Sequence, residues 1–458
     1  MSEKFSSDAR TARSLQRAVR EGNAYSVMAG VGESYFAAYA LFLKATTTHI
    51  AFLASVPALL GSFAQLFSAW LGHRLGHRKP IIIAGVTLQA LAWLPMIWLP
   101  YFFPDYAVPL LLGFVVLYYA GANIASPGWL SLMGDLVPED QRGRYFGHRS
   151  RSMNLTTFIA MATGGVVLHF AELGDRAHIG FLSIFTLAMG ARLYSAYQVH
   201  CIPDPGHHVT AADGSPLRFR DLIKEIRGTL FARYVGCMAA LNFAAGIAGP
   251  FFAVYMLRDL EFSYLEFMLS SAVVVIMQFL TLGTWGRLSD KFGNRVVMAA
   301  TGYLIGVVPL LWLFTSNFWA IIVIQLVSGL AWAGFNLSSS NFLYDTVQPQ
   351  RRAPFSAMHN VVGAVAIFAG AALGGYLATN LPQDLKLLGF KWGFESSLVW
   401  LFLLSSVGRL YVAAVLMPRL REVRAVPKIS RRELLSQAFG LSAFVALCTA
   451  LVERVRIR

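Results

Sequence analysis

Long apolar segments alternate with short polar ones along most of the chain. Runs of about 20 mostly apolar residues are long enough to cross the hydrocarbon core of a bilayer, and twelve such runs lie between residues 23 and 417. Their approximate centres are residues 34, 59, 91, 119, 158, 188, 244, 274, 306, 330, 367 and 406. The pattern predicts an all-α membrane protein with twelve transmembrane helices.

The composition agrees with this assignment. Of the 458 residues, 56% are apolar and 14% are charged, and the mean hydropathy is +0.55, whereas soluble proteins have about 25% charged residues. A net charge of +14 would suggest nucleic-acid binding in a soluble chain, but here the cations cluster in the loops, where they set topology. We therefore expect contact with the lipid bilayer and none with nucleic acid.

The loop cations predict the orientation of the spans. With a cytoplasmic N-terminus, 31 of the 38 Lys and Arg residues lie in cytoplasmic segments and five lie in the outer loops. This asymmetry predicts that the N- and C-termini are both cytoplasmic. No signal peptide is recognisable before the first span. The expected location is a cell membrane, and specifically the inner membrane of a bacterium.

The two halves of the chain resemble each other at a nearly constant offset. Residues 30–41 (GVGESYFAAYAL) align with residues 246–257 (GIAGPFFAVYML), 216 positions later. The triplet Arg-Leu-Tyr at 192–194 recurs 217 positions later at 409–411. Ordered matches at equivalent topological positions are the signature of an internal repeat. The repeat predicts two parallel six-helix bundles.

The polar segments predict the domain boundaries. The predicted parts are a cytoplasmic amphipathic N-terminal segment (1–22), an N-terminal six-helix bundle (23–202), a cytoplasmic linker (203–228), a C-terminal six-helix bundle (229–417) and a cytoplasmic tail (418–458). Within the tail, residues 434–452 are apolar between basic flanks, which favours a helix at the inner membrane surface. A thirteenth span is the alternative interpretation of this stretch.

The doubled unit LGHRLGHR at residues 71–78 raises the question of a metal site, because His73 and His77 lie one helical turn apart. Two imidazoles are too few for a closed zinc site, and the adjacent Arg74 and Arg78 would repel a cation. We therefore expect no metal and no cofactor.

The second-half counterpart of this loop is GRLSDKFGNR at residues 286–295. It resembles the loop signature G-x-L-x-D-[RK]-x-G-[RK]-[RK] of the major facilitator superfamily, and the first-half loop keeps the cations but has His73 where the acid belongs. The resemblance covers essentially the whole chain and implies a gating role for these loops. The motif residues and their charged neighbours are Arg74, Gly76, Arg78, Gly286, Asp290, Lys291, Gly293, Arg295, Asp135, Arg142, Arg144, Asp345 and Arg352. The acid of such a loop can pair with a neighbouring cation or helix end and hold one conformation, and we call this contact the latch. We expect Asp290, with Arg142 and Arg144 as partners, to form a better preserved latch than the first-half loop does.

Glu33 is the one carboxylate clearly placed at bilayer depth, near the middle of the first predicted span. Its counterpart in the repeat is Gly249, so the acid occurs in one copy only, which indicates a role in the binding site rather than in the shared architecture. A hydrogen bond between helices is the alternative. Because burial disfavours the ionised form of a carboxyl group, Glu33 is a candidate proton carrier or, if ionised, a partner for a cationic substrate.

Other polar side chains within the spans are candidates to line the same cavity, although amides also join helices in membranes. They are Tyr35, Tyr39, Asn123, Asn154, Asn242, Gln278, Asn336, Asn341 and Asn360. Arg192 and Arg409, which match in the repeat, are expected to have an architectural role with side chains that extend towards the cytoplasmic interface.

The resemblance implies a secondary transporter that moves a small solute by rocking one bundle against the other. The expected partners are a small-molecule substrate, protons and lipid, and the expected state is a monomer. No H-E-x-x-H motif and no nucleophile paired with a base is recognisable, so we do not expect an enzyme. A receptor or scaffold that keeps the fold without transport is the alternative.

Overall fold

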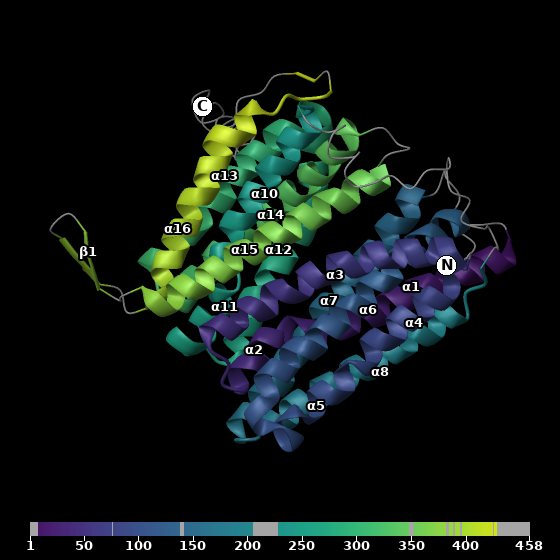
Figure 1. Ribbon diagram of the computed structural model, residues 1–458, viewed down its shortest axis with the longest axis horizontal. Helices are drawn as coiled ribbons and strands as arrows, with labels where there is room; N and C mark the ends of the chain where they lie inside the picture. Colours follow the sequence, from purple (N-terminus) through teal and green to yellow (C-terminus); the bar gives the residue numbers. More distant parts are fainter. Residues whose placement is uncertain are drawn as a thin grey trace, which may run out of the picture. The chain divides into compact units, whose positions relative to one another are not determined.

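The computed structural model describes residues 8–75, 77–137, 142–204, 228–347, 352–381, 384–387, 390–393, 396–424 and 426–427. Helices make up nearly all of this part of the chain (Figure 1). The chain forms two compact units, one of residues 1–218, 246–272 and 360–401, and the other of residues 219–245, 273–359 and 402–458.

The helices of the first half are α1 (Ala9–Val31), α2 (Phe36–Phe42), α3 (Thr47–Leu75), α4 (Lys79–Leu91), α5 (Trp93–Phe102), α6 (Ala107–Leu136), α7 (Arg142–Leu173) and α8 (Ala177–His200). Those of the second half are α10 (Leu230–Ala248), α11 (Phe251–Val254), α12 (Tyr264–Phe292), α13 (Asn294–Leu311), α14 (Phe318–Thr346), α15 (Arg352–Asn380) and α16 (Leu398–Tyr411). Between α15 and α16, strands β1 (Asp384–Leu387) and β2 (Phe390–Gly393) form an antiparallel hairpin in which Leu385 lies opposite Trp392.

The helices confirm the predicted membrane architecture. Within the described residues, 11 helical segments are long and apolar enough to cross a membrane, and each contains one predicted span centre. The first predicted span is not among them because its helix starts in a polar segment and is interrupted in the middle. The predicted linker and the apolar stretch 434–452 lie largely or wholly outside the described residues.

The interruption lies at Gly32. Helix α1 ends at Val31, a 3₁₀ turn covers Glu33–Tyr35, and α2 begins at Phe36. A Cβ atom on Gly32 would lie 2.4 Å from Cη2 of Trp93, which is much closer than carbon atoms approach in proteins. Glycine therefore allows the indole of α5 to pack against the break, and Glu33 is left in an irregular turn.

Helix α1 begins earlier than the sequence pattern predicts. The carboxylate of Asp8 caps it by accepting hydrogen bonds from the backbone N–H groups of Arg10 and Thr11, and the bonds from Thr11 hold the pKa of Asp8 below its usual value. Leu15 and Ala18 are buried. Residues 9–22 are thus the first turns of a packed helix, and no boundary separates them from residues 23–31.

Helices approach each other closely at equivalent glycine residues in the two halves. In the first unit, α1 packs against α7 and α8, and α6 packs against α3 and α4. A Cβ atom on Gly30 would lie 2.6 Å from the carbonyl oxygen of Thr157 in α7. At the equivalent position, a Cβ atom on Gly246 would lie 2.6 Å from the carbonyl oxygen of Ile367 in α15. The duplicated sequence therefore forms the same close helix contact twice.

Candidate functional site

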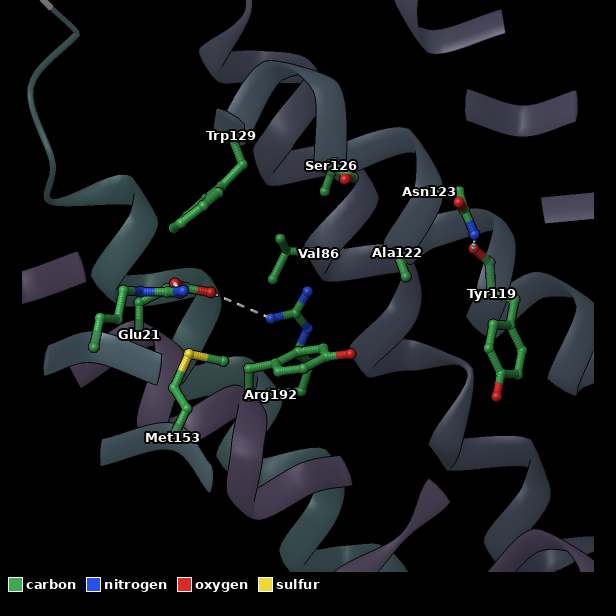
Figure 2. A pocket seen from close by; sticks show the side chains of 12 residues that line it. Glu21, Val86, Tyr119, Ala122, Asn123, Ser126, Trp129, Met153 and Arg192 are labelled. Carbon is green, nitrogen blue, oxygen red and sulfur yellow. Dashed lines mark hydrogen bonds and ion pairs between the residues drawn. The ribbon is translucent and has the colours of Figure 1, made fainter. Parts of the chain in front are cut away.

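A cavity of about 380 Å³ lies within the first unit, among helices α1, α4, α6, α7 and α8 (Figure 2). Its lining combines charged, aromatic and small polar side chains. The lining residues are Glu21, Tyr25, Val86, Tyr119, Ala122, Asn123, Ala125, Ser126, Trp129, Arg149, Met153 and Arg192. Of these, the sequence pattern identified only Asn123 as a candidate for the binding site.

Three charged side chains meet in this cavity. Glu21 is 5% exposed, and its Oε2 lies 2.8 Å from Nη2 of Arg149. Its Oε1 lies 3.6 Å from Nη1 of Arg192 and accepts a hydrogen bond from Ser195. One carboxylate therefore faces two guanidinium groups, and the lining has a formal charge of +1.

Arg192 contacts several neighbouring side chains. Its Nε donates to Oε1 of Gln89 at 2.8 Å and its Nη1 donates to Oγ of Ser195 at 2.8 Å, while the guanidinium lies 5.0 Å from the ring centre of Tyr25. The side chain is buried and, as Figure 2 shows, lies in the lining of the cavity. The side chain of Arg192 therefore ends in a buried ion pair with Glu21 inside the bundle.

Arg409, the repeat equivalent of Arg192, is also buried but has a different environment. Its Nη1 and Nη2 donate to the backbone carbonyls of Ile305 and Ala245 at 3.3 and 3.4 Å. Its Nε has no hydrogen-bond partner within the described residues. The two arginines are thus matched in sequence and burial, whereas the acidic partner occurs in the first half.

Arg149 lies between the acid and an aromatic ring. Its Nε donates to the backbone carbonyl of Ala18 at 3.2 Å, and its guanidinium carbon lies 4.3 Å from the ring centre of Trp129. The indole Nε1 of Trp129 is buried and has no hydrogen-bond partner in the described part of the chain. The cavity lining therefore includes a residue with an unsatisfied donor.

Glu33 lies next to this cavity rather than in its lining. Its Oε2 accepts a hydrogen bond from the hydroxyl of Tyr118 at 2.8 Å, and its Oε1 accepts one from Tyr119 at 2.7 Å. Tyr119 lines the cavity, and its carbonyl oxygen accepts from Nδ2 of Asn123. None of the ion pairs formed among the described residues includes Glu33. A half-buried carboxyl group held by two phenols is thereby connected to the charged cavity.

Most of the other predicted polar residues lie elsewhere. Tyr35 and Tyr39 are 1% exposed and donate to the backbone carbonyls of Met161 and Met96, so they hold helices together. Asn154, Asn336 and Asn360 are exposed, whereas Asn242, Gln278 and Asn341 are partly buried. None of these eight residues lines the cavity of the first half.

Comparison of the two halves could have identified Glu21, Arg149 and Arg192 as site residues, although the sequence pattern did not single them out as such. At offsets of 216 and 211, Glu21, Glu33 and Arg149 correspond to Cys237, Gly249 and Asn360. The charged set is therefore unique to the first half, although Arg192 and Arg409 are common to both. An arginine inside a span requires a buried partner, and Glu21 is the nearest acid that precedes the first apolar run.

The first-half gating loop forms a latch that is centred on Arg78. Its guanidinium is buried and lies 2.6 Å from Oδ2 of Asp135 and 2.9 Å from Oδ1 of Asp204, and Nη1 donates to Ser131. Burial opposes the charge of Arg78, but the hydrogen bonds and charges of Asp204 and Asp135 outweigh it and raise the pKa of Arg78 above its usual value. The first half thus has a well-formed latch although His73 replaces the motif acid.

The second-half loop is closed by residues that follow the last span. Oε2 of Glu422 accepts from the backbone N–H of Arg295 at 2.7 Å. Arg424 lies 2.9 Å from Asp345 and 3.6 Å from Asp290, and the hydrogen bond to Asp345 raises the pKa of Arg424.

Asp290 is not the centre of this latch. Its side chain is 77% exposed, whereas Asp345 also accepts from Asn294 at 2.7 Å. The expectation that Asp290 preserves the stronger latch therefore differs from the structure.

Of the remaining residues predicted to belong to the gating motif, Gly293 has a clear structural role, whereas Lys291 and Gly286 make few contacts. Gly293 has φ of 91°, and a Cβ atom there would lie 2.5 Å from Oε2 of Glu422, so both backbone conformation and space require glycine. Lys291 is exposed and its Nζ lies 5.0 Å from the ring centre of Phe292. A Cβ atom on Gly286 would meet only Leu337, at 3.8 Å. Gly76 and the side chains of Arg74, Arg142, Arg144 and Arg352 lie outside the described part.

Metal chemistry has no candidate site in the described residues, where no group of three or more His, Cys, Asp or Glu side chains is arranged to hold an ion.

A sequence model identifies the family of the chain, and solved structures match its fold. The sequence model described as Major Facilitator Superfamily matches residues 24–234 and again residues 234–452, which confirms the predicted repeat. No curated protein matches the chain in sequence.

Solved structures match over most of their lengths at low identity. A D-xylose-proton symporter has 15% identity and a TM-score of 0.66, with 91% of this chain and 99% of that one covered. The nucleoside transporter NupG has 14% identity and a TM-score of 0.65, with 90% and 99% covered. A bacterial homologue of the iron transporter ferroportin, in an inward-facing state, has 13% identity and a TM-score of 0.65, with 90% and 99% covered.

Proposed function

Because the chain belongs to the Major Facilitator Superfamily of membrane-spanning secondary transporters, we propose that it moves a small polar solute by alternating access and that Glu33 couples this movement to protons. The first-half cavity forms part of the solute path. The repeat of six spans supports this mechanism, since two parallel bundles can rock about a site near the bilayer midplane.

The position of Glu33 in a broken helix is the observation that carries the proposal. Transporters place substrate and ion sites at interrupted helices, where irregular backbone lines a cavity. Here the interruption covers Gly32 to Tyr35, and Glu33 connects to the cavity through Tyr119. Because none of the ion pairs among the described residues includes Glu33, transfer of a proton to it breaks no ion pair in that part of the chain.

The distribution of Lys and Arg supports cytoplasmic N- and C-termini, which places the Arg78 and Arg424 latches at the cytoplasmic side. A bacterial inner membrane, a monomeric state and the absence of enzymatic activity complete the proposal. The contacts of Arg78 argue against a transport-inactive receptor. Although the first-half motif is altered, its loop is still held by ion pairs from Arg78 to two acids.

The test uses the purified protein in liposomes that contain a trapped pH-sensitive dye. Polar solutes are added in turn, and solute-driven proton entry is recorded for the native protein, for Glu33→Gln and for Glu172→Gln, whose carboxylate is exposed at the end of α7. We expect proton entry with the native protein and Glu172→Gln, and solute exchange without proton entry with Glu33→Gln. Unchanged proton entry in Glu33→Gln contradicts the coupling role, and absence of flux for every solute contradicts transport.

A further inference from the structure

The charge of the first-half cavity restricts what it can bind. Arg149 and Arg192 contribute two positive charges to the lining, and Glu21 contributes one negative charge. All three side chains are largely buried: the exposed fractions are 12% for Arg149, 5% for Arg192 and 6% for Glu21. An excess charge in a desolvated site is costly unless a counter-charge balances it.

The lining also offers hydrogen-bond donors that have no partner among the described residues. A guanidinium has five N–H donors arranged in a fork that fits an oxyanion, and the contacts of Arg149 to Ala18 and Glu21 use two of them. The indole Nε1 of Trp129 has no partner within the described residues. An excess of donors and of positive charge favours an acceptor-rich, negatively charged group and disfavours a cation.

The remaining lining residues suit a small organic molecule. A volume of about 380 Å³ falls in the range of small-molecule sites. The side chains of Trp129, Met153 and Tyr119 supply apolar and aromatic surface, and Asn123 and Ser126 supply polar groups. Figure 2 shows these side chains on several helices around the Glu21 and Arg192 pair.

We propose that the first-half cavity binds the oxyanion group of a small monoanionic organic solute through Arg149, and that Glu33 carries the proton that balances this charge. The inference rests on the proposed function, because it names the substrate class of that same site. Among the described residues, the charged groups that face Glu21 and Glu33 from the packed helices are Arg149 and Arg192, and the titratable groups are Tyr25, Tyr118 and Tyr119.

The charge balance predicts the stoichiometry. When Glu33 is ionised, Glu21, Glu33, Arg149 and Arg192 sum to zero. Protonation of Glu33 leaves a charge of +1, which a monoanion brings back to zero. One proton therefore accompanies one monoanion, and transport is electroneutral.

The binding test uses thermal unfolding of the purified protein with pairs of small molecules that differ only in charge. The probes are benzoate and benzamide, lactate and lactamide, and glucuronate and glucose. We expect stabilisation by at least one anion and not by its neutral partner. Equal stabilisation by both members of each pair, or no stabilisation by any anion, overturns the proposal.

Two variants of one ion pair separate a charge effect from a packing effect. Arg149→Gln should weaken binding of the effective anion at least about tenfold, as expected for one lost charge-assisted hydrogen bond, whereas Glu21→Gln should strengthen it because the net positive charge rises. Both variants break the same pair, so a purely structural role would change binding in the same direction. Arg151→Gln, two residues further along α7 and exposed, is the matched control and should behave like the native protein.

Transport of the effective anion into liposomes then tests the stoichiometry. Uptake should follow the pH gradient and should not respond to a membrane potential imposed with valinomycin and potassium. Uptake driven by the potential contradicts electroneutral coupling. Proton-coupled uptake of a neutral solute would overturn the substrate class and leave the proposed transport function intact.

Discussion

Nη1 of Arg78 lies 2.6 Å from Oδ2 of Asp135, in a latch that joins the loop after α3 to the end of α6. Arg78 is buried, and Asp204 after α8 binds the same guanidinium. In the second half, two arginines make the equivalent contacts. Arg295 contacts Glu422 and Pro418 near the end of the last span, and Arg424 binds Asp345. One residue in the first half therefore does what two residues do in the second.

This difference predicts unequal effects of replacing the two equivalent arginines. Arg78→Ala should lower the free energy of unfolding by about 2–4 kcal/mol, because it removes the buried guanidinium that binds both Asp135 and Asp204, although both acids are partly exposed. Arg295→Ala removes one side-chain hydrogen bond to a carbonyl and should cost about 1 kcal/mol. Thermal unfolding of both purified variants provides the comparison, and equal losses would show that the latch is not centred on Arg78.

The two motif glycines of the second half should also differ in their tolerance of alanine. Gly293→Ala places a Cβ atom 2.5 Å from Glu422 in a backbone with φ of 91°, and we expect a loss of stability of at least about 1 kcal/mol. Gly286→Ala lies within helix α12, with its nearest contact at 3.8 Å. It should be neutral or stabilising by about 0.5–1 kcal/mol. Thermal unfolding that ranks the two variants in the opposite order would contradict this explanation.

The repeat-matched arginines Arg192 and Arg409 offer a second comparison. Arg192→Met leaves Glu21 with Arg149 alone, and we expect a loss of about 2–4 kcal/mol. Arg409→Met removes a buried guanidinium that contacts only carbonyl oxygens among the described residues. This change should cost less than about 1 kcal/mol and can be stabilising. Denaturation of the two methionine variants in the same detergent measures the difference, and a larger loss in Arg409→Met would be incompatible with it.

The phenols that bind Glu33 should support proton coupling. The hydroxyls of Tyr118 and Tyr119 donate to Glu33, and Tyr119 also lines the cavity. Tyr119→Phe removes the donor to Oε1 of Glu33, and solute-driven proton entry into liposomes should fall by about fivefold, as expected for one lost hydrogen bond. Tyr39→Phe is the control, since its hydroxyl donates to the carbonyl of Met96. Equal proton entry in Tyr119→Phe and in the native protein would rule out a role for this hydrogen bond.

The candidate site was only partly predictable. Glu33 was recognisable because a carboxylate within an apolar run is costly and lacks a counterpart in the repeat. Tyr35 and Tyr39 carry equally suggestive side chains on the same span, but their hydroxyls bond to backbone carbonyls between helices. The sequence alone does not distinguish a phenol that faces a cavity from one that fills a helix contact, because that depends on how each helix is rotated.

Hydropathy and internal similarity determined the helical membrane architecture and the repeat, because each depends on residues close together in the chain or on direct comparison of its halves. The charged cavity was decided by tertiary structure. Glu21 and Arg149 are 128 positions apart, and they meet because α1 packs against α7 through Gly30. Only that packing turns a polar residue in the middle of the first helix into the buried partner of two arginines.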